Sequence, residues 1–213
     1  QTELSPVATF LGTEHHTPEG LKSGKLRSAG RATRVCEVRI VDDTGAPLPT
    51  GKIGEIAVKG PITMLGYWNK PDITAATLRN GWVHTGDAGY MDDDGYVFLM
   101  DRVKDMIVSG GENVYSAEVE NALGQHRAVA TSAVIGIPSD QWGESVHAIV
   151  ILHPDATTSE DDLKAHCHDL IAGYKCPRSF EFRIDPFPLS GANKVLKTEL
   201  RKPFWEGRDR NIS

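Results

Sequence analysis

The 213-residue sequence is 39% hydrophobic and 24% charged, and its formal net charge at pH 7 is -6. This composition is typical of a soluble globular protein of one or two domains, and no apolar run approaches the roughly 18 residues of a membrane-spanning helix. The negative net charge argues against nucleic acid as the main partner, although local positive clusters can still bind small anions.

The start of the chain and its cysteines indicate a truncated protein from a reducing compartment. The chain begins at Gln1 without a methionine or a signal peptide, which indicates a truncated sequence. The cysteines are odd in number and widely spaced: Cys36, Cys167 and Cys176. They do not form the framework of a disulfide-rich secreted domain, so we expect a cytoplasmic protein. The sequence His166-Cys167-His168 could suggest a metal site. Residues two apart on a helix do not converge on one metal ion, however, so we expect these histidines to lie on the surface of a helix.

The first half of the chain predicts short strands. After an irregular stretch over residues 1–31, the alternation of apolar and polar residues over 33–41 predicts a strand. Further elements follow at Gly- and Asp-rich turns: a short helix over 71–78 and strands over 54–60, 81–85 and 96–100. Short strands separated by such turns predict a small distorted β-barrel or antiparallel sheet.

After Asp101 the pattern changes to alternating helices and strands. Ser116 is expected to cap a helix that runs to about Gln125, and Ser159 to Asp162 has the form of a capping box for a helix ending near Gly173. Other elements are expected as strands over 128–137, 145–152 and 179–184, and as a closing helix over 195–205 that Pro203 stops or kinks. The fold class is therefore α+β, with domains at 1–101 and 102–213 and a hinge near 102–105.

Three short motifs place polar residues where a nucleotide could bind, but each has a plainer interpretation. Strand 81–85 would end at a glycine and present Asp87 at its tip, either to a ribose diol or as an ordinary turn residue. Gly110 and Gly111 let a backbone approach a ligand closely, or form a simple turn. Lys194 precedes the last helix and can meet a phosphate, or remain a surface lysine.

The order and spacing of five signatures resemble the AMP-forming adenylate ligases, which include acyl- and aryl-CoA synthetases, peptide-synthetase adenylation domains and luciferases. The signatures are Gln1-Thr2-Glu3, Gly66-Tyr67-Trp68-Asn69-Lys70-Pro71, Thr85-Gly86-Asp87, the segment 101–107 with Gly110-Gly111-Glu112-Asn113, and the Lys194 loop. The resemblance covers essentially the whole chain. It implies that residues 1–101 end a large N-terminal AMP-binding domain and that residues 102–213 form its small mobile lid domain.

The resemblance also implies roles for individual residues. Thr2 would contact the α-phosphate of ATP and Glu3 would bind Mg²⁺. The other implied roles are ribose binding by Asp87 and Arg102, a hinge at Lys104, a pantetheine tunnel at Gly110 and Gly111, and catalysis of adenylation by Lys194. Asn193 stands where the family usually has glycine, and asparagine is the next best residue for a left-handed backbone.

The implied reaction is the ATP-dependent, AMP-forming ligation of a carboxylic acid, of the fatty-acid type, to CoA. The cofactors and partners are then ATP or AMP, Mg²⁺, CoA and the acid, and a homodimer is possible. The chain alone is expected to be inactive, because the family's phosphate-binding loop would precede Gln1. The chain ends at Ser213, soon after the last helix, which favours a free-standing synthetase. The alternative is a non-catalytic module that binds nucleotide or CoA.

Overall fold

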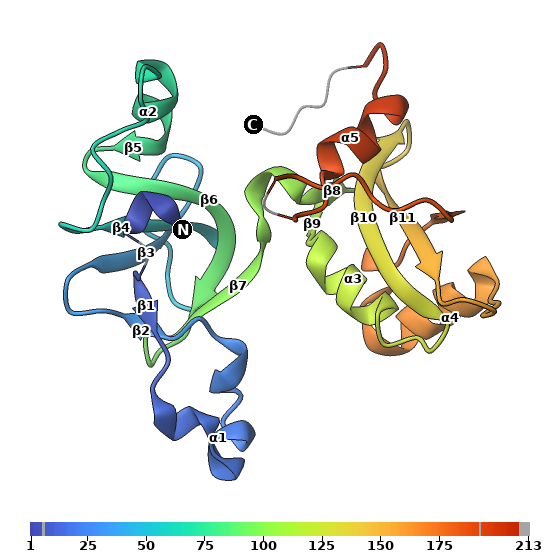
Figure 1. Ribbon diagram of the computed structural model, residues 1–213, viewed down its shortest axis with the longest axis horizontal. Helices are drawn as coiled ribbons and strands as arrows, with labels where there is room; N and C mark the ends of the chain where they lie inside the picture. Colours follow the sequence, from blue (N-terminus) through green and yellow to red (C-terminus); the bar gives the residue numbers. More distant parts are fainter. Residues whose placement is uncertain (6, 192, 209–213) are drawn as a thin grey trace. The chain divides into compact units, whose positions relative to one another are not determined.

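The computed structural model describes residues 1–5, 7–191 and 193–208. The chain divides into two compact units, Gln1–Val103 and Lys104–Ser213, which we call the first and second units (Figure 1). Both units combine helices with β-sheet, so the predicted α+β class is confirmed. The predicted hinge and the mobility of the second unit remain predictions.

The first unit is built on a curled antiparallel sheet (Figure 1) with the strand order β3-β4-β6-β5 and with β7 paired to β6. The strands are β3 (Glu37–Val41), β4 (Gly54–Lys59), β5 (Leu78–Arg79), β6 (Trp82–Met91) and β7 (Val97–Arg102). The antiparallel sheet that the sequence predicts is therefore confirmed. Its buried side chains come from alternate positions of the strands, as a half-buried sheet requires: Val38, Ile40, Ile56, Val58, Val83 and Val97.

Short elements surround this sheet. They are β1 (Thr9–Phe10) paired with β2 (Arg31–Ala32), the helix α1 (Pro18–Lys22), the helix α2 (Pro71–Thr77), and the 3-10 turns η1 (Thr2–Leu4), η2 (Thr13–His16) and η3 (Lys25–Arg27). The predicted strand over 33–41 begins only at Glu37. Before that residue the chain turns, because the amide of Cys36 donates to the carbonyl of Thr33.

The second unit is a mixed sheet covered on both faces. Its order is β10-β11-β8-β9, and β12 pairs in parallel with β11. The strands are β8 (Ile107–Ser109), β9 (Glu112–Val114), β10 (Val129–Ser139), β11 (Gly143–Leu152) and β12 (Ser179–Phe182). η4 (Val103–Asp105) crosses the boundary between the units. The other elements of the second unit are α3 (Ser116–Leu123), α4 (Glu160–Leu170), η5 (Gly173–Lys175), α5 (Lys197–Arg201) and η6 (Lys202–Phe204).

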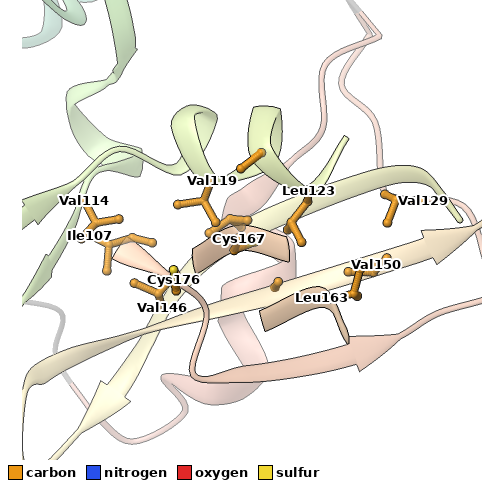
Figure 2. Packing of buried hydrophobic residues seen from close by; sticks show 13 residues of the cluster. Ile107, Val114, Val119, Leu123, Val129, Val146, Val150, Leu163, Cys167 and Cys176 are labelled. Carbon is orange, nitrogen blue, oxygen red and sulfur yellow. The ribbon is translucent and has the colours of Figure 1, made fainter. Parts of the chain in front are cut away.

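The alternation of β10 and β11 explains the two covered faces. Val134 packs in the cluster with α3 and α4. Figure 2 shows Val146 and Val150 of the same cluster beside Val119, Leu123 and Leu163. The neighbouring positions Ile135 and Ile149 point the other way and pack with side chains from α5 and the segment before it. Both faces are covered, so the central stretches 133–137 and 148–152 of these strands hold apolar residues and one glycine.

Two helix starts test the predicted caps. Ser159 and Asp162 form the predicted capping box at the start of α4, which ends at Leu170 rather than near Gly173. The predicted cap at Ser116 is wrong: Ser116 is the first residue of α3, and Tyr115 stands at the cap position, where its side chain makes no capping hydrogen bond. The Ser116 hydroxyl instead accepts a hydrogen bond from Lys197, 81 residues away. The hydroxyl oxygen of Ser116, which the local sequence predicts to cap the helix, is therefore bound by the ammonium group of Lys197.

The cysteines are free, and two of them are buried. Burial raises the pKa of the Cys167 thiol to about 12, which keeps it in the protonated form. His166 lies beside the carbonyl of Ala122, with Nε2 at 2.9 Å. No helix among the described residues combines the length and the apolar character that crossing a membrane requires.

Replacing a central core residue is expected to destabilise the second unit. Leu163 belongs to α4 and is fully buried in the cluster between this helix and the sheet. Leu163→Ala leaves a cavity there and lowers the free energy of unfolding by about 2–5 kcal/mol. Urea denaturation measures this change. Leu170→Ala is the matched control, because Leu170 lies on the same helix and is 45% exposed. Equal losses for both variants would contradict the assigned core.

Candidate functional site

Asp87 and Arg102 face each other across β6 and β7. They are register partners in the ladder, and Arg102 Nη1 lies 2.9 Å from Asp87 Oδ1. Both side chains are partly exposed, at 45% for Arg102 and 23% for Asp87. The pair therefore presents a carboxylate and a guanidinium side by side to a ligand, a combination that can accept and donate hydrogen bonds.

The predicted strand end before Asp87 is wrong. β6 continues to Met91, and the motif Thr85-Gly86-Asp87 lies in its middle, where the pairing with β4 shifts register. Gly86 has a φ of +70°, which glycine adopts without strain. The irregularity interrupts the pairing with β4, while Asp87 pairs with Arg102 on the other side of β6.

Glu55 of β4 supports this irregularity, and the sequence analysis did not identify it. Its Oε1 accepts a hydrogen bond from the amide of Gly86 at 2.8 Å, and its Oε2 lies 2.7 Å from His84 Nδ1. The Thr85 hydroxyl donates to the carbonyl of Ile56 at 2.7 Å. These bonds satisfy a backbone group that the register shift leaves without a ladder partner. The only sequence signal was a carboxylate in the segment Gly54–Lys59.

Thr2 and Glu3 lie on η1, which Leu4 anchors in the core of the first unit. The carbonyl of Glu3 accepts a hydrogen bond from the amide of Met64 at 2.8 Å. The Glu3 carboxylate accepts another from the Tyr67 hydroxyl, also at 2.8 Å. In the sequence, Tyr67 stands only as part of a signature, without a role of its own. Its position makes it the side chain that holds Glu3.

The environment of Glu3 favours the ionised carboxylate. Its own backbone N–H, then the Tyr67 hydroxyl, lower the pKa of Glu3, with a smaller contribution from the positive charge of Arg102; partial burial acts in the opposite direction. The same interaction raises the pKa of Tyr67. Among the described residues, no group of three or more His, Cys, Asp or Glu side chains could hold a metal by itself. An ionised Glu3 still fits Mg²⁺, which proteins commonly bind through one or two carboxylates together with substrate phosphates and water.

Lys104, Gly110 and Gly111 lie in the second unit. Lys104 is exposed on η4. The two glycines form the turn between β8 and β9, a hairpin that the sequence analysis did not predict. Their φ angles of +64° and +83° explain the paired glycines, because a two-residue turn of this kind needs positive φ at both positions. A Cβ on Gly110 would also lie 2.9 Å from the Trp142 ring, so the turn packs closely.

Lys194 is carried by a small hairpin. Leu189 and Val195 form a β-bridge, and the amide of Ser190 donates to the carbonyl of Lys194 at 2.8 Å. Asn193 has a φ of +59°, so the expected left-handed conformation at this position is confirmed. The Lys194 side chain is exposed. The hairpin therefore presents an ammonium group to solvent from a base that backbone hydrogen bonds close.

The structure thus groups the predicted residues within each unit. Thr2 and Glu3 share the first unit with Asp87 and Arg102, and Arg102 is close enough to influence the pKa of Glu3. The remaining four, Lys104, Gly110, Gly111 and Lys194, belong to the second unit. Their roles remain predictions. A separate surface pocket of the first unit is lined by Phe10, Arg31, Arg34 and Tyr96, among others, and contains none of the predicted residues.

Comparison with known proteins identifies relatives along the whole chain. Residues 1–68 match the family described as AMP-binding enzyme, and residues 118–194 match the AMP-binding enzyme C-terminal domain. A fatty acid–[acyl-carrier-protein] ligase of Streptomyces coeruleorubidus is 42% identical over 212 residues, covering 100% of this chain and 40% of the relative. A feruloyl-CoA synthase of an Amycolatopsis species is 43% identical over 203 residues, covering 95% and 40%.

A solved structure is similar over nearly the same range. The o-succinylbenzoate CoA synthetase of Bacillus subtilis, in complex with an acyl-adenylate intermediate, superposes with a TM-score of 0.85 and 38% identity. The match covers 93% of this chain and 39% of that one. The chain thus spans about 40% of the length of the curated relatives it matches.

Removing the Tyr67 hydroxyl is expected to raise the pKa of Glu3, because the hydrogen bond stabilises the ionised carboxylate. The measurement is a pH titration of the Glu3 side-chain carboxyl carbon by NMR in Tyr67→Phe and in the unmodified chain. A depressed pKa contributes stability above the unfolded-state value, and this contribution is lost as the pH falls through the folded-state value. The variant should lose part of it. Tyr90→Phe serves as control, and identical Glu3 titrations in Tyr67→Phe and the unmodified chain would refute the assignment.

Proposed function

We propose that this chain, which belongs to the AMP-binding enzyme family, forms the C-terminal part of an AMP-forming ligase that joins a carboxylic acid to a thiol. Matches to both family segments and relatives with 42% and 43% identity support the proposal. We use "parent enzyme" for the protein that contains this chain together with any preceding sequence. Because the chain spans about 40% of its relatives, we expect activity from the parent enzyme and not from the chain alone.

The observation that carries the proposal is the convergence of distant signature residues in the first unit. Glu3 is held by Tyr67 at 2.8 Å, and Asp87 is held by Arg102 at 2.9 Å. Arg102 also contributes to the lowered pKa of Glu3. Residues up to 99 positions apart in the chain therefore form two polar pairs in the first unit, near enough for Arg102 to act on Glu3, which fits a ligand that carries both hydroxyl groups and phosphates.

The first proposed step is the attack of the carboxylate on the α-phosphorus of ATP, with pyrophosphate as the leaving group. Asp87 accepts hydrogen bonds from the ribose hydroxyls, and Arg102 holds the Asp87 carboxylate in place. Thr2 donates to the α-phosphate. Glu3 would hold Mg²⁺, which would supply positive charge to the phosphate oxygens. Lys194 supplies a positive charge to the oxygens of the phosphorus under attack, where negative charge develops.

The second proposed step is the attack of a thiol on the carbonyl carbon of the acyl-adenylate, with AMP as the leaving group. A rotation of the second unit about Lys104 withdraws Lys194 and brings the turn at Gly110 and Gly111 to the site. Both residues of the turn are glycines, so neither carries a Cβ atom, and both have a positive φ. A narrow thiol arm can therefore lie against this backbone. One site then serves both half-reactions because the lid moves.

We propose a fatty acid as the carboxylic acid and CoA as the thiol. The names of the relatives support a fatty-acid or an aryl substrate, and they include an acyl-carrier-protein as well as CoA as the acceptor. Pyrophosphate exchange with dodecanoate and with ferulate, followed by thioester formation with CoA and with phosphopantetheinylated carrier protein, distinguishes these possibilities. A cytoplasmic location and a homodimer also remain proposals.

Replacing Lys194 is expected to separate the two half-reactions. In the parent enzyme, Lys194→Ala should lower dodecanoate-dependent pyrophosphate exchange by about 10²–10³-fold, because one group that stabilises the developing charge is lost. Thioester formation from supplied dodecanoyl-adenylate and CoA should be retained. Both rates are measured on the same preparation.

Lys202→Ala is the control, because Lys202 is an exposed lysine of the same segment outside the proposed site. Equal effects of Lys194→Ala on both half-reactions would contradict the assignment of Lys194. A parent enzyme that binds ATP or CoA but supports neither half-reaction, with dodecanoate or with ferulate, would favour the alternative, a non-catalytic binding module.

A further inference from the structure

Lys197 joins the hairpin of Lys194 to a different part of the second unit. It is the first residue of α5 and lies three positions after Lys194. Its Nζ donates to the Ser116 hydroxyl at 2.6 Å and lies 2.6 Å from Glu120 Oε1. The same Glu120 oxygen accepts a hydrogen bond from the amide of Val134 at 2.8 Å. Lys197 thus fixes the start of α5 to α3 and β10.

The other end of α5 is fixed near the predicted hinge. Arg201 Nη1 donates to the carbonyl of Lys104 at 3.2 Å. Arg201 Nη2 lies 3.1 Å from Asp105 Oδ1, and the contact is an ion pair rather than a hydrogen bond, since that oxygen has no hydrogen-bond partner among the described residues. Both side chains are buried. Two cations four residues apart therefore hold this short helix at both ends.

The hairpin continues directly into the helix that these cations hold. The amide of Leu196 donates to the carbonyl of Pro188 at 2.8 Å and closes the hairpin next to Lys197. Leu200 and Phe187 pack with Ile135 and Ile149 beneath it. Apolar packing is non-directional and sets an approximate position for the helix. The short polar contacts of Lys197 then define the position of α5 along its axis and its rotation about that axis.

We propose that Lys197 is a positioning residue, which fixes the hairpin so that the Lys194 ammonium group reaches the phosphorus during adenylation. This inference rests on the proposed function of Lys194. The Lys197 ammonium group is bound by Ser116 and Glu120. In this proposal it does not contact the substrate. Its effect is confined to the half-reaction that uses Lys194, because thioester formation takes place with Lys194 withdrawn.

The test uses Lys197→Met, Lys197→Arg and Lys164→Met in the parent enzyme. Methionine keeps the length and apolar contacts of the lysine stem and removes the ammonium group. Lys164→Met is the matched control, because Lys164 is partly exposed and forms an ion pair with Glu160 at 3.9 Å within α4. Three quantities are measured: amide hydrogen exchange across residues 188–196, the kcat and KM of dodecanoate-dependent pyrophosphate exchange, and thioester formation from supplied dodecanoyl-adenylate.

Lys197→Met is expected to accelerate hydrogen exchange in residues 188–196 and to lower the kcat of pyrophosphate exchange by about 10²-fold, the scale of a misplacement near 1 Å. The KM for ATP and the rate of thioester formation should stay unchanged. Lys197→Arg should restore most of the kcat, because it keeps the positive charge. Lys164→Met should change none of these quantities.

The inference is overturned if Lys197→Met leaves either the hairpin exchange or the kcat unchanged, or if both half-reactions fall together with loss of protection throughout the second unit. The latter result would assign Lys197 a purely structural role. A Lys194→Ala variant that retains full pyrophosphate exchange would refute the proposed function instead. Hydrogen exchange in the Lys197 variants would then still decide whether Lys197 anchors the hairpin.

Discussion

The pairing of Asp87 with Arg102 across β6 and β7 is the interaction on which the candidate site depends. It depends on the register shift between Ala88 and Gly89 in the β6–β7 ladder, because extending the pairing of Gly89 with Leu99 without a shift would place Asp87 opposite Asp101. The β4–β6 ladder has its own register shift next to the pair, where Gly86 has a positive φ and its amide donates to Glu55. The polar pair therefore lies where the ladders on both sides of β6 are irregular.

In the second unit, both faces of the sheet are covered, and Lys194 is exposed on a hairpin beside the second of these faces. α3 and α4 cover one face, and α5 with the segment before it covers the other. The hairpin of Lys194 leads into α5, so its position depends on the packing of the second face. A five-residue helix has little stability of its own, and its tertiary contacts supply the rest.

Local sequence patterns predicted much of this fold. The strand Gly54–Lys59, the helix that starts at Pro71 and the capping box at Ser159 agree with the structure because each depends on neighbouring residues. The failures share a cause. Ser116 does not cap α3 because Lys197 binds its hydroxyl, and the strand through Asp87 does not end because β4 and β7 pair with it on both sides. Distant partners override local preference.

For the candidate site, the sequence by itself determined the residue types and their order: an acidic residue at Glu3, an aspartate and an arginine at 87 and 102, paired glycines, and a lysine before the last helix. The left-handed conformation at Asn193 was also determined locally, since few residues adopt it. Only the tertiary structure decided that Tyr67 holds Glu3, that Glu55 supports Gly86, and that Lys197 reaches Ser116. Each of these contacts joins residues 31 or more positions apart, and the side chains involved are common polar types whose partners depend on how the chain packs.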